Sequence, residues 1–388
     1  MVRTGLDRLL DRNDIIRNRR MGLIANHTSV NADLRYSWDL LAEAGADLQI
    51  IFSPEHGLFG IEQDQEPVSE APPLSHRVES LYGDSVVTLA PFEEHLAELD
   101  AVFFDIQDVG SRYYTYVNTM VLFMRALHGR GIEFIVLDRP NPLGGLVVEG
   151  PGIREGYESF VGILPVPVRH GLTPGEMARM ALSKFKIDLE LTVIEMEGWD
   201  RSMYFDDTGI PWVPPSPNMP TLSTAMVYPG ACLFEGTTVS EGRGTTTPFE
   251  VIGAPGVSPL DLARELDGLP LPGVRFRPVW YRPGFNKHCG KTAGGVFIHV
   301  TDRKIFRPFA TGVALVSVFH GLYPGFEFTR GVYEFNSKHP AFDLLTGGMC
   351  IRNMIEEGVP VVRILDSWGE EEDIAAETMR EFHMYGDS

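Results

Sequence analysis

Apolar and polar positions alternate regularly over the first half of the chain. Short apolar runs that predict strands occur at Met21–Ala25, Leu48–Phe52, Val86–Leu89, Ala101–Ile106 and Phe134–Leu137. Residues 36–44 and 115–128 carry apolar side chains at helical spacing, and a glycine follows each segment. Strands that alternate with helices predict an α/β fold with a mostly parallel sheet, helices on both faces and right-handed connections.

The chain after residue 140 is richer in loops. Residues 173–176, Thr-Pro-Gly-Glu, combine a helix-capping residue, a proline at the first helical position and a glutamate three residues after the cap. This pattern predicts a helix through about Phe185, and a strand is predicted at Leu189–Ile194. Stretches rich in Pro, Gly or Thr at 141–171, 212–220 and 234–255 predict loops, which often carry functional side chains.

From about residue 255 the pattern changes again. Asp261–Leu266 and Arg307–Leu322 predict helices, and Gly295–Val300 predicts a strand. A chain of 388 residues is long for one hydrophobic core. We therefore expect two domains, an α/β domain at residues 1–254 and a smaller domain at residues 255–388.

The overall charge narrows the choice of partners. The net charge is −20, from 53 acidic and 33 basic residues, which argues against nucleic acids and anionic membranes as partners. Neither the N-terminal residues nor any later run has the apolar length of a signal peptide or membrane span. We expect a cytoplasmic protein, or an exported one if a signal has been trimmed. The three cysteines are far apart, which predicts buried thiols without a zinc site or disulfide.

A short polar motif directly follows the second predicted strand. Ser-Pro-Glu-His-Gly at 53–57 places Glu55 and His56 between two residues that end a strand. Open α/β sheets bind their ligands at the carboxyl ends of strands. A carboxylate and an imidazole on a stiff turn at that edge suit acid–base chemistry, although a solvated surface turn would have the same sequence.

A second polar cluster follows the strand near residue 104. Asp105 and Asp108 lie directly after this strand, and Arg112 and Tyr116 come soon afterwards. Tyrosines beside carboxylates suit a sugar, whose ring has an apolar face and a polar rim. Polar residues of this kind at the ends of two strands are less easily explained by chance than a single such cluster.

Two further clusters come next along the chain. Asp138 follows another predicted strand and suits a structural role as well as a functional one, whereas Arg139 and Asn141 look more like ligand contacts. Arg169 and His170 precede the capped helix. A helix N-terminus favours contact with an anion or hydroxyl, so this pair is a further candidate.

The last polar residues of interest lie in the two later loops. Asn218 is the main polar donor of a proline-rich loop at 214–220. Glu235, Glu241 and Arg243 lie in a stretch whose glycines allow the backbone close to a ligand. The alternative for this stretch is a hairpin-like turn with solvated charges.

Cofactor motifs are missing from the sequence. Neither GxGxxG after a strand nor GxxxxGK[ST] occurs, so the α/β pattern does not indicate a nucleotide. His27, His56, Asp105 and His170 could be considered as metal ligands, but none has a recognised ligand spacing. We expect neither an organic cofactor nor a metal.

Taken in order, these motifs resemble the exo-β-N-acetylmuramidase family of glycoside hydrolases. Each piece is weak alone, but the ordered set is specific and is densest between Gly22 and Pro255. The pieces are Ser-Pro-Glu-His-Gly at 53–57, Ser-Leu-Tyr-Gly at 80–83, Asp-Ile-Gln-Asp-Val-Gly at 105–110, Tyr-Thr-Tyr at 114–116, Asp-Arg-Pro-Asn-Pro at 138–142, Glu-Gly-Pro at 149–151, Arg-His-Gly-Leu-Thr at 169–173, Pro-Ser-Pro-Asn-Met-Pro at 215–220, Glu-Gly-Thr at 235–237 and Ser-Glu-Gly-Arg-Gly-Thr at 240–245.

The resemblance implies a fold and an activity. The fold would be a Rossmann-like catalytic domain with a smaller α+β C-terminal domain that closes the cleft. The activity would be release of terminal N-acetylmuramic acid from the non-reducing end of peptidoglycan fragments, without metal or organic cofactor. The partner would be a muropeptide or another peptidoglycan-derived saccharide, and the oligomeric state is left open.

The resemblance also implies that Glu55 is catalytic. We expect it to act as general acid, held protonated by partial burial, with His56 orienting it or binding a neighbouring hydroxyl. The second catalytic group stays open, because the substrate's acetamido group can replace a carboxylate in this chemistry. The candidate carboxylates are Asp105, Asp108, Glu149 and Glu241.

Selectivity for muramic acid should require a cation, because its lactyl group carries a carboxylate that glucosamine lacks. A guanidinium can bind a carboxylate with two hydrogen bonds. The candidates are Arg243 first, then Arg139, with Arg112 and Arg169 after them. The other expected substrate contacts are Asn26, Tyr116, Asn141, Glu149, His170, Asn218, Glu235 and Glu241.

Two rival functions remain open from sequence, and a third is disfavoured. A non-catalytic binding protein for cell-wall sugars would keep the aromatic and arginine side chains but tolerate loss of the Glu55 carboxylate. A hydrolase of another amino-sugar glycoside would use the same chemistry on a different sugar. An amidase or esterase is disfavoured, because Ser111 and Ser240 lack the GxSxG nucleophile motif.

Overall fold

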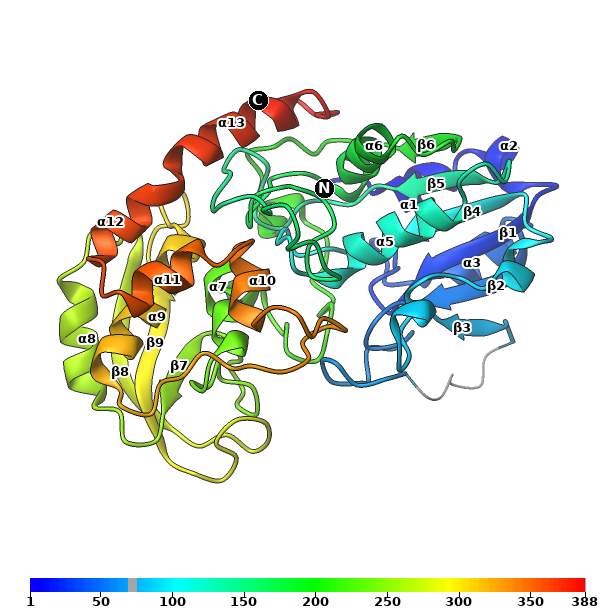
Figure 1. Ribbon diagram of the computed structural model, residues 1–388. Helices are drawn as coiled ribbons and strands as arrows, with labels where there is room; N and C mark the ends of the chain where they lie inside the picture. The colour runs from blue at the N-terminus through cyan, green and yellow to red at the C-terminus, as the bar shows by residue number, and fades with distance from the viewer. Residues whose placement is uncertain (69–74, 388) are drawn as a thin grey trace.

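The computed structural model describes residues 1–68 and 75–387. They form two units that lie side by side, each with a sheet and helices (Figure 1). The larger unit contains a six-stranded, wholly parallel sheet in the order β3-β2-β1-β4-β5-β6. Its strands are β1 (Arg20–Ala25), β2 (Asp47–Ser53), β3 (Val78–Ser80), β4 (Ala101–Asp105), β5 (Glu133–Leu137) and β6 (Leu191–Ile194). The strand order reverses between β1 and β4, where Rossmann-like sheets open a crevice at their carboxyl edge.

Helices cover both faces of the large sheet, as predicted. Consecutive residues of β4 point to opposite faces, so Phe103 packs into one apolar cluster with Trp38 while Phe104 packs into another with Phe123. The helices on the Phe103 side are α1 (Gly5–Leu9) and α3 (Ser37–Glu43), and those on the Phe104 side are α5 (Thr115–Ala126) and α6 (Pro174–Phe185). The short helices α2 (Asn13–Ile16) and α4 (Glu93–Leu96) complete this unit.

A smaller α+β unit follows, also as predicted. Its antiparallel sheet has the order β7-β9-β8. The strands are β7 (Val251–Ala254), β8 (Val274–Tyr281) and β9 (Ala293–Val300). The helices are α7 (Leu222–Ala231), α8 (Pro259–Asp267), α9 (Pro308–Leu322), α10 (Ala341–Thr346), α11 (Cys350–Glu356), α12 (Val361–Leu365) and α13 (Gly369–Arg380). Helices α7 and α9 cross closely at Gly230, where an added Cβ would lie 1.9 Å from the Pro308 carbonyl oxygen.

Two sequence-based expectations need correction. Val86–Leu89 is a 3₁₀ helix and not a strand. Val86 and Val87 are exposed, so their β-branched side chains do not pack against a sheet as strand residues would. The edge strand is instead β3, which pairs with β2 and was missed because it is short and mostly polar. Of the three thiols expected to be buried, only Cys232 is buried, and Cys289 and Cys350 are exposed.

The division after residue 254 stays a prediction. Helix α7 and strand β7 both precede that position, and they pack against α9 and β9 of the smaller unit.

The start of α6 forms as its sequence predicts and anchors the end of the chain. Thr173 and Glu176 make the reciprocal capping box, with Pro174 in the first turn. After α13 the chain returns towards α6 (Figure 1), where Tyr385 donates a hydrogen bond to Asp138. Asp138 also accepts hydrogen bonds from Thr173 and from the Gly175 N–H. This aspartate therefore ties β5, α6 and the C-terminal tail together.

Candidate active site

A cleft lies where the carboxyl edge of the large sheet meets the smaller unit. Four carboxylates and one arginine are among the described residues that line it. The first half of the chain contributes Glu55, His56, Asp64, Tyr113, Tyr114, Thr115 and Val161. The second half contributes Ser216, Asn218, Met219, Tyr228, Glu235, Arg243, Phe249, Tyr333 and Glu334.

Glu55 occupies the turn directly after β2. Its side chain is buried, with 4% of the residue exposed. Oε2 accepts a 2.6 Å hydrogen bond from the Thr115 hydroxyl at the start of α5, and Oε1 accepts one of 3.2 Å from the Gln65 backbone N–H. Both oxygens are thus held, so the carboxyl group has one orientation in the cleft wall.

His56 is fixed by the backbone around it. It adopts a left-handed conformation with φ of 68°, and Gly57 continues the turn with φ of 76°. The Nδ1 atom lies 2.8 Å from the Glu62 carbonyl oxygen. Because a carbonyl only accepts hydrogen bonds, Nδ1 carries the proton and Nε2 is left as an acceptor in the neutral ring.

Glu334, which the sequence analysis missed, places a second carboxylate in the cleft from the segment between α9 and α10. Tyr82 donates a 2.9 Å hydrogen bond to its Oε2. Consecutive left-handed residues, Glu334 at φ 44° and Phe335 at φ 63°, produce the sharp turn. Burial first, and the charge of Glu55 second, raise the pKa of Glu334 well above its ordinary value.

Arg243 is the centre of an acidic cluster in the same wall. Its guanidinium lies 2.8 Å from Glu235, 3.1 Å from Glu241 and 3.1 Å from Asp64. Lys287 also pairs with Glu241 at 2.9 Å. Burial opposes ionisation of Glu241, but the charges of Lys287 and Arg243 outweigh it and lower its pKa to about 2. The guanidinium is therefore already surrounded by carboxylates.

Asp105, Asp108 and His170, which the sequence predicted as site residues, are outside the described lining of the cleft. Asp105 makes a buried 2.6 Å ion pair with Arg139, which also donates to the Val30 carbonyl. Asp108 accepts a hydrogen bond from the Gly110 N–H and lies 3.9 Å from His170. Burial raises the pKa of Asp108 to about 7 and lowers that of His170 to about 3, because it disfavours the charged form of each side chain.

Other predicted contacts hold the backbone around the cleft. The Asn26 Oδ1 accepts two hydrogen bonds from Thr28, and the Tyr116 hydroxyl donates to the Pro215 carbonyl. Asn141 bridges backbone groups of Leu143 and Leu172. None of these three predicted residues is among the described lining of the cleft.

Arg169 and Glu149 are also engaged within the protein. Arg169 donates to the Leu143 carbonyl. Glu149 accepts a 2.8 Å hydrogen bond from the Ala310 N–H at the start of α9, and its carboxylate lies 3.4 Å from Arg307. Glu149 therefore fastens the smaller unit to the larger one. Of the predicted substrate contacts, only Asn218, Glu235 and Arg243 are in the described lining.

Arg112 fastens the two units in a different way. Its guanidinium donates to the carbonyls of Pro151, Val166 and Leu345, at 2.6, 2.9 and 2.7 Å, and is buried. Leu345 belongs to α10 in the smaller unit, whereas the other two carbonyls precede α6. Arg112 thus links the two units through three backbone carbonyls, and we call this contact the Arg112 clamp.

We expect Arg112→Ala to lower the free energy of unfolding by about 3 kcal/mol or more, because three buried carbonyls lose their donor. Urea denaturation measures this loss. Arg154→Ala is the matched control, because it removes an exposed guanidinium that pairs with Glu371, for a loss of about 1 kcal/mol or less. Similar losses in the two variants would contradict the clamp.

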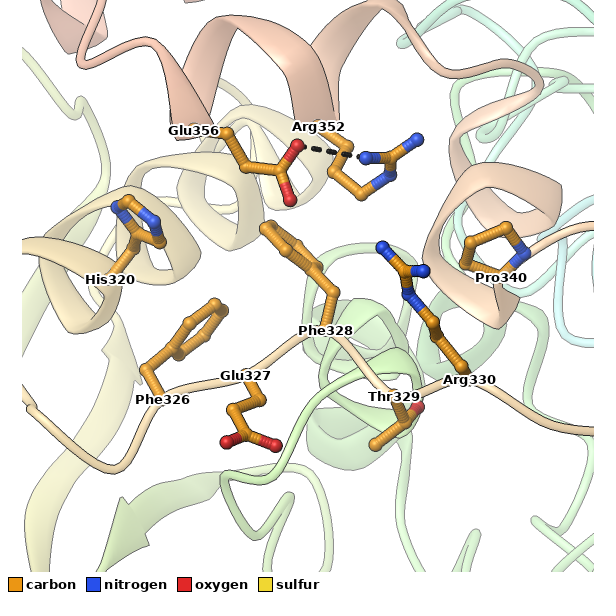
Figure 2. A pocket seen from close by; sticks show the side chains of 9 residues that line it. All are labelled: His320, Phe326, Glu327, Phe328, Thr329, Arg330, Pro340, Arg352 and Glu356. Atoms are coloured by element: carbon orange, nitrogen blue, oxygen red, sulfur yellow. Dashed lines mark hydrogen bonds and ion pairs between the residues drawn. The ribbon is translucent and has the colours of Figure 1, made fainter.

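A separate, larger cavity of about 640 Å³ lies in the smaller unit (Figure 2). The phenyl ring of Phe328 stands beside the ion pair between Arg352 and Glu356, and Arg330 faces the same space. No residue is shared between its described lining and that of the Glu55 cleft.

The described residues contain no group of three His, Cys, Asp or Glu side chains placed to hold a metal ion. No described helix is both long and apolar enough to cross a bilayer.

Comparison with known proteins agrees with the motifs. The family model described as "Exo-beta-N-acetylmuramidase NamZ, N-terminal" matches residues 21–223, and its C-terminal counterpart matches residues 226–385. A protein of Bacillus subtilis (strain 168), "Peptidoglycan beta-N-acetylmuramidase NamZ", is 44% identical over 388 residues, which cover 99% of this chain and 91% of that protein.

Two solved structures from Bacteroides fragilis NCTC 9343 have the same fold. Both are described as DUF1343 family proteins. One has a TM-score of 0.88 and 32% identity, with 99% of each chain covered. The other has a TM-score of 0.79 and 29% identity, with 100% of each chain covered. The two family models and the 44% identity to the Bacillus protein together establish that this chain belongs to the exo-β-N-acetylmuramidase NamZ family of glycosidases.

Proposed function

We propose that this protein releases terminal N-acetylmuramic acid from the non-reducing end of peptidoglycan fragments, with Glu55 as the general acid. The observation that carries the proposal is the pair of buried carboxylates, Glu55 and Glu334, that enter one cleft from opposite units. Family membership and the name of the Bacillus relative support the sugar and the bond. Glycoside hydrolysis needs one group to protonate the leaving oxygen and another to stabilise an oxocarbenium-like centre.

The contacts of Glu55 suit a proton donor. The Gln65 N–H holds Oε1 in its place, so Oε2 is the oxygen that exchanges a proton. The Thr115 hydroxyl next to Oε2 can donate to a carboxylate or accept from a carboxylic acid, because its hydrogen rotates. The site therefore accommodates both protonation states of Glu55 during turnover.

Glu334 is our choice for the second carboxylate. Burial first, and the charge of Glu55 second, raise the pKa of Glu334, which disfavours ionisation of both groups at once and favours a pair that holds one proton. In the reaction that proton goes to the leaving oxygen, and the remaining negative charge faces the developing cation. Asp105, Asp108, Glu149 and Glu241 remain predictions from sequence, but none is in the described lining of the cleft.

Arg243 has a different proposed role from the one expected from sequence. A lactyl carboxylate beside it would meet the carboxylates of Asp64, Glu235 and Glu241, which already offset its charge. We therefore assign Arg243 to holding Asp64 and Glu235 at the cleft wall, where they can accept hydrogen bonds from sugar hydroxyls. Asn218 is the one amide side chain in the described lining of the cleft and suits the same purpose.

A chromogenic β-N-acetylmuramide tests the activity directly. We expect release of the chromophore from the muramide and at most a tenth of that rate, roughly, from the matching glucosaminide, because the family and the Bacillus relative are named for the muramide bond. Binding of the muramide without any release would favour the sugar-binding alternative. Preference for the glucosaminide would favour a hydrolase of another amino sugar.

The position of cleavage needs a second substrate. From a peptide-free tetrasaccharide with muramic acid at its non-reducing end, the first products should be free N-acetylmuramic acid and a trisaccharide. Early appearance of disaccharides would contradict terminal release.

A further inference from the structure

A second groove adjoins the catalytic cleft at Glu334, which lies in the described wall of both. The groove has a volume of about 350 Å³ and is enclosed by α5, the end of α6, the 3₁₀ helix Val86–Leu89 and the loop around Phe160. Its described lining is Val86, Leu89, Leu122, Arg125, Glu158, Ser159, Phe160, Ile163, Phe185, Glu334, Phe335 and Asn336. The groove therefore begins at the same carboxylate that forms part of the cleft wall.

Aromatic side chains join the groove to the catalytic carboxylate. Phe335 directly follows Glu334, and its ring packs against Tyr82 with centroids 5.3 Å apart and against Phe160 at 6.3 Å. Tyr82 is also the hydrogen-bond donor to Glu334. Apolar and aromatic walls of this kind suit the C–H faces of sugar rings.

The described lining of this groove contains one cation, Arg125, and two carboxylates, Glu158 and Glu334, among mostly apolar side chains. The Arg125 guanidinium lies over the Phe185 ring, with its central carbon 3.8 Å from the ring centroid. Arg125 makes no ion pair with any described residue, in contrast to Arg243. Stacking orients the plane of the guanidinium but leaves the N–H groups at its edge free. In a chain with a net charge of −20, an arginine without an acidic partner beside the active site is well placed to bind an anionic ligand.

We propose that this groove binds the leaving part of the glycan, and that Arg125 pairs with the lactyl carboxylate of the next muramic acid along the chain. The inference rests on the proposed function. An enzyme that removes the terminal sugar meets more glycan only on the leaving side of the bond, so a groove that continues the cleft holds that side. Peptidoglycan glycans alternate glucosamine and muramic acid, so the third sugar from the end is the first beyond the bond with a carboxylate.

The test compares a peptide-free disaccharide with a tetrasaccharide, both with muramic acid at the non-reducing end. For the unchanged protein we expect kcat/KM to be about two- to fivefold higher for the tetrasaccharide, the effect of one ion pair at an exposed arginine. Arg125→Ala should remove this advantage and leave turnover of the disaccharide and the chromogenic muramide unchanged. A tetrasaccharide whose inner lactyl group is a methyl ester should lose the same advantage in the unchanged protein.

The controls separate this inference from the proposed function. Arg130→Ala removes a nearby surface arginine that pairs with Glu93 outside the groove, and it should keep the tetrasaccharide preference. Equal kcat/KM values for the two oligosaccharides in the unchanged protein would overturn the inference while the function stands. A loss of chromogenic muramide turnover in Arg125→Ala would also overturn it, because Arg125 would then contact the terminal sugar. No hydrolysis of any muramide by the unchanged protein would remove the function itself.

Discussion

Glu55→Gln is expected to lower kcat/KM on a muramyl disaccharide by about 10²–10⁴-fold, the usual contribution of a positioned general acid. The substitution keeps the shape of the side chain. An amide can still accept from the Gln65 N–H at one end and contact the Thr115 hydroxyl at the other. The loss should therefore reflect the missing proton, and the thermal midpoint of unfolding should stay close to that of the unchanged protein.

The leaving group distinguishes an acid from a residue that only binds. An aryl muramide with an acidic phenol needs little protonation as it departs, so Glu55→Gln should retain far more of its activity on that substrate than on the disaccharide. Glu66→Gln, an exposed change near the same turn, is the control and should leave both rates unaltered. Equal losses on the two substrates would assign the proton to another group, and full activity on both would remove Glu55 from the mechanism.

The strand ends near this glutamate were predictable because their signals are local. An apolar run followed by breakers specifies both a buried strand and the place where it stops. The carboxyl ends of parallel strands then meet at one edge of the sheet. Glu55 after β2 and Asp105 at the end of β4 could therefore be assigned to the same edge from sequence alone. The capping box at Thr173 was equally local, and it forms.

The sequence did not show which of those polar residues line the cleft and which pair with other buried groups. A sheet edge with several charged side chains also needs buried partners to satisfy them. Asp105 pairs with Arg139, and Asp138 binds the C-terminal tail, so both serve the scaffold that carries Glu55. In sequence these residues look the same as catalytic ones. Only their partners, which come from distant positions, separate the two roles.

Glu334 could not be predicted from the sequence motifs for a related reason. It does not follow a strand, and 279 positions, the difference between 334 and 55, separate it from Glu55. Its place depends on the packing of the smaller unit against the larger one, which the Arg112 clamp and the Glu149 contact maintain. The proposed pairing of Glu55 with Glu334 would make catalysis sensitive to how the two units are joined.

Glu334→Gln should lower activity by about 10²-fold or more on the disaccharide and the activated aryl muramide alike, because it removes charge stabilisation that both reactions need. It should also move the alkaline limb of the pH–kcat/KM profile to lower pH. In the unchanged protein, burial and the charge of Glu55 raise the pKa of Glu334, so the pair keeps its proton as the pH rises. Glutamine does not titrate, so the variant lacks this raised pKa, and activity should fall at lower pH.

Two variants show whether this effect belongs to the carboxylate. Tyr82→Phe removes the hydrogen bond to Glu334 but keeps its charge, so it should cost about tenfold or less and preserve the alkaline limb. Glu327→Gln changes an exposed glutamate earlier in the same segment and should alter neither rate nor profile. If Glu334→Gln lost activity only on the disaccharide, Glu334 would be the proton donor and Glu55 its partner. An unchanged alkaline limb would mean that the two carboxylates do not share a proton, and the paired mechanism would fail.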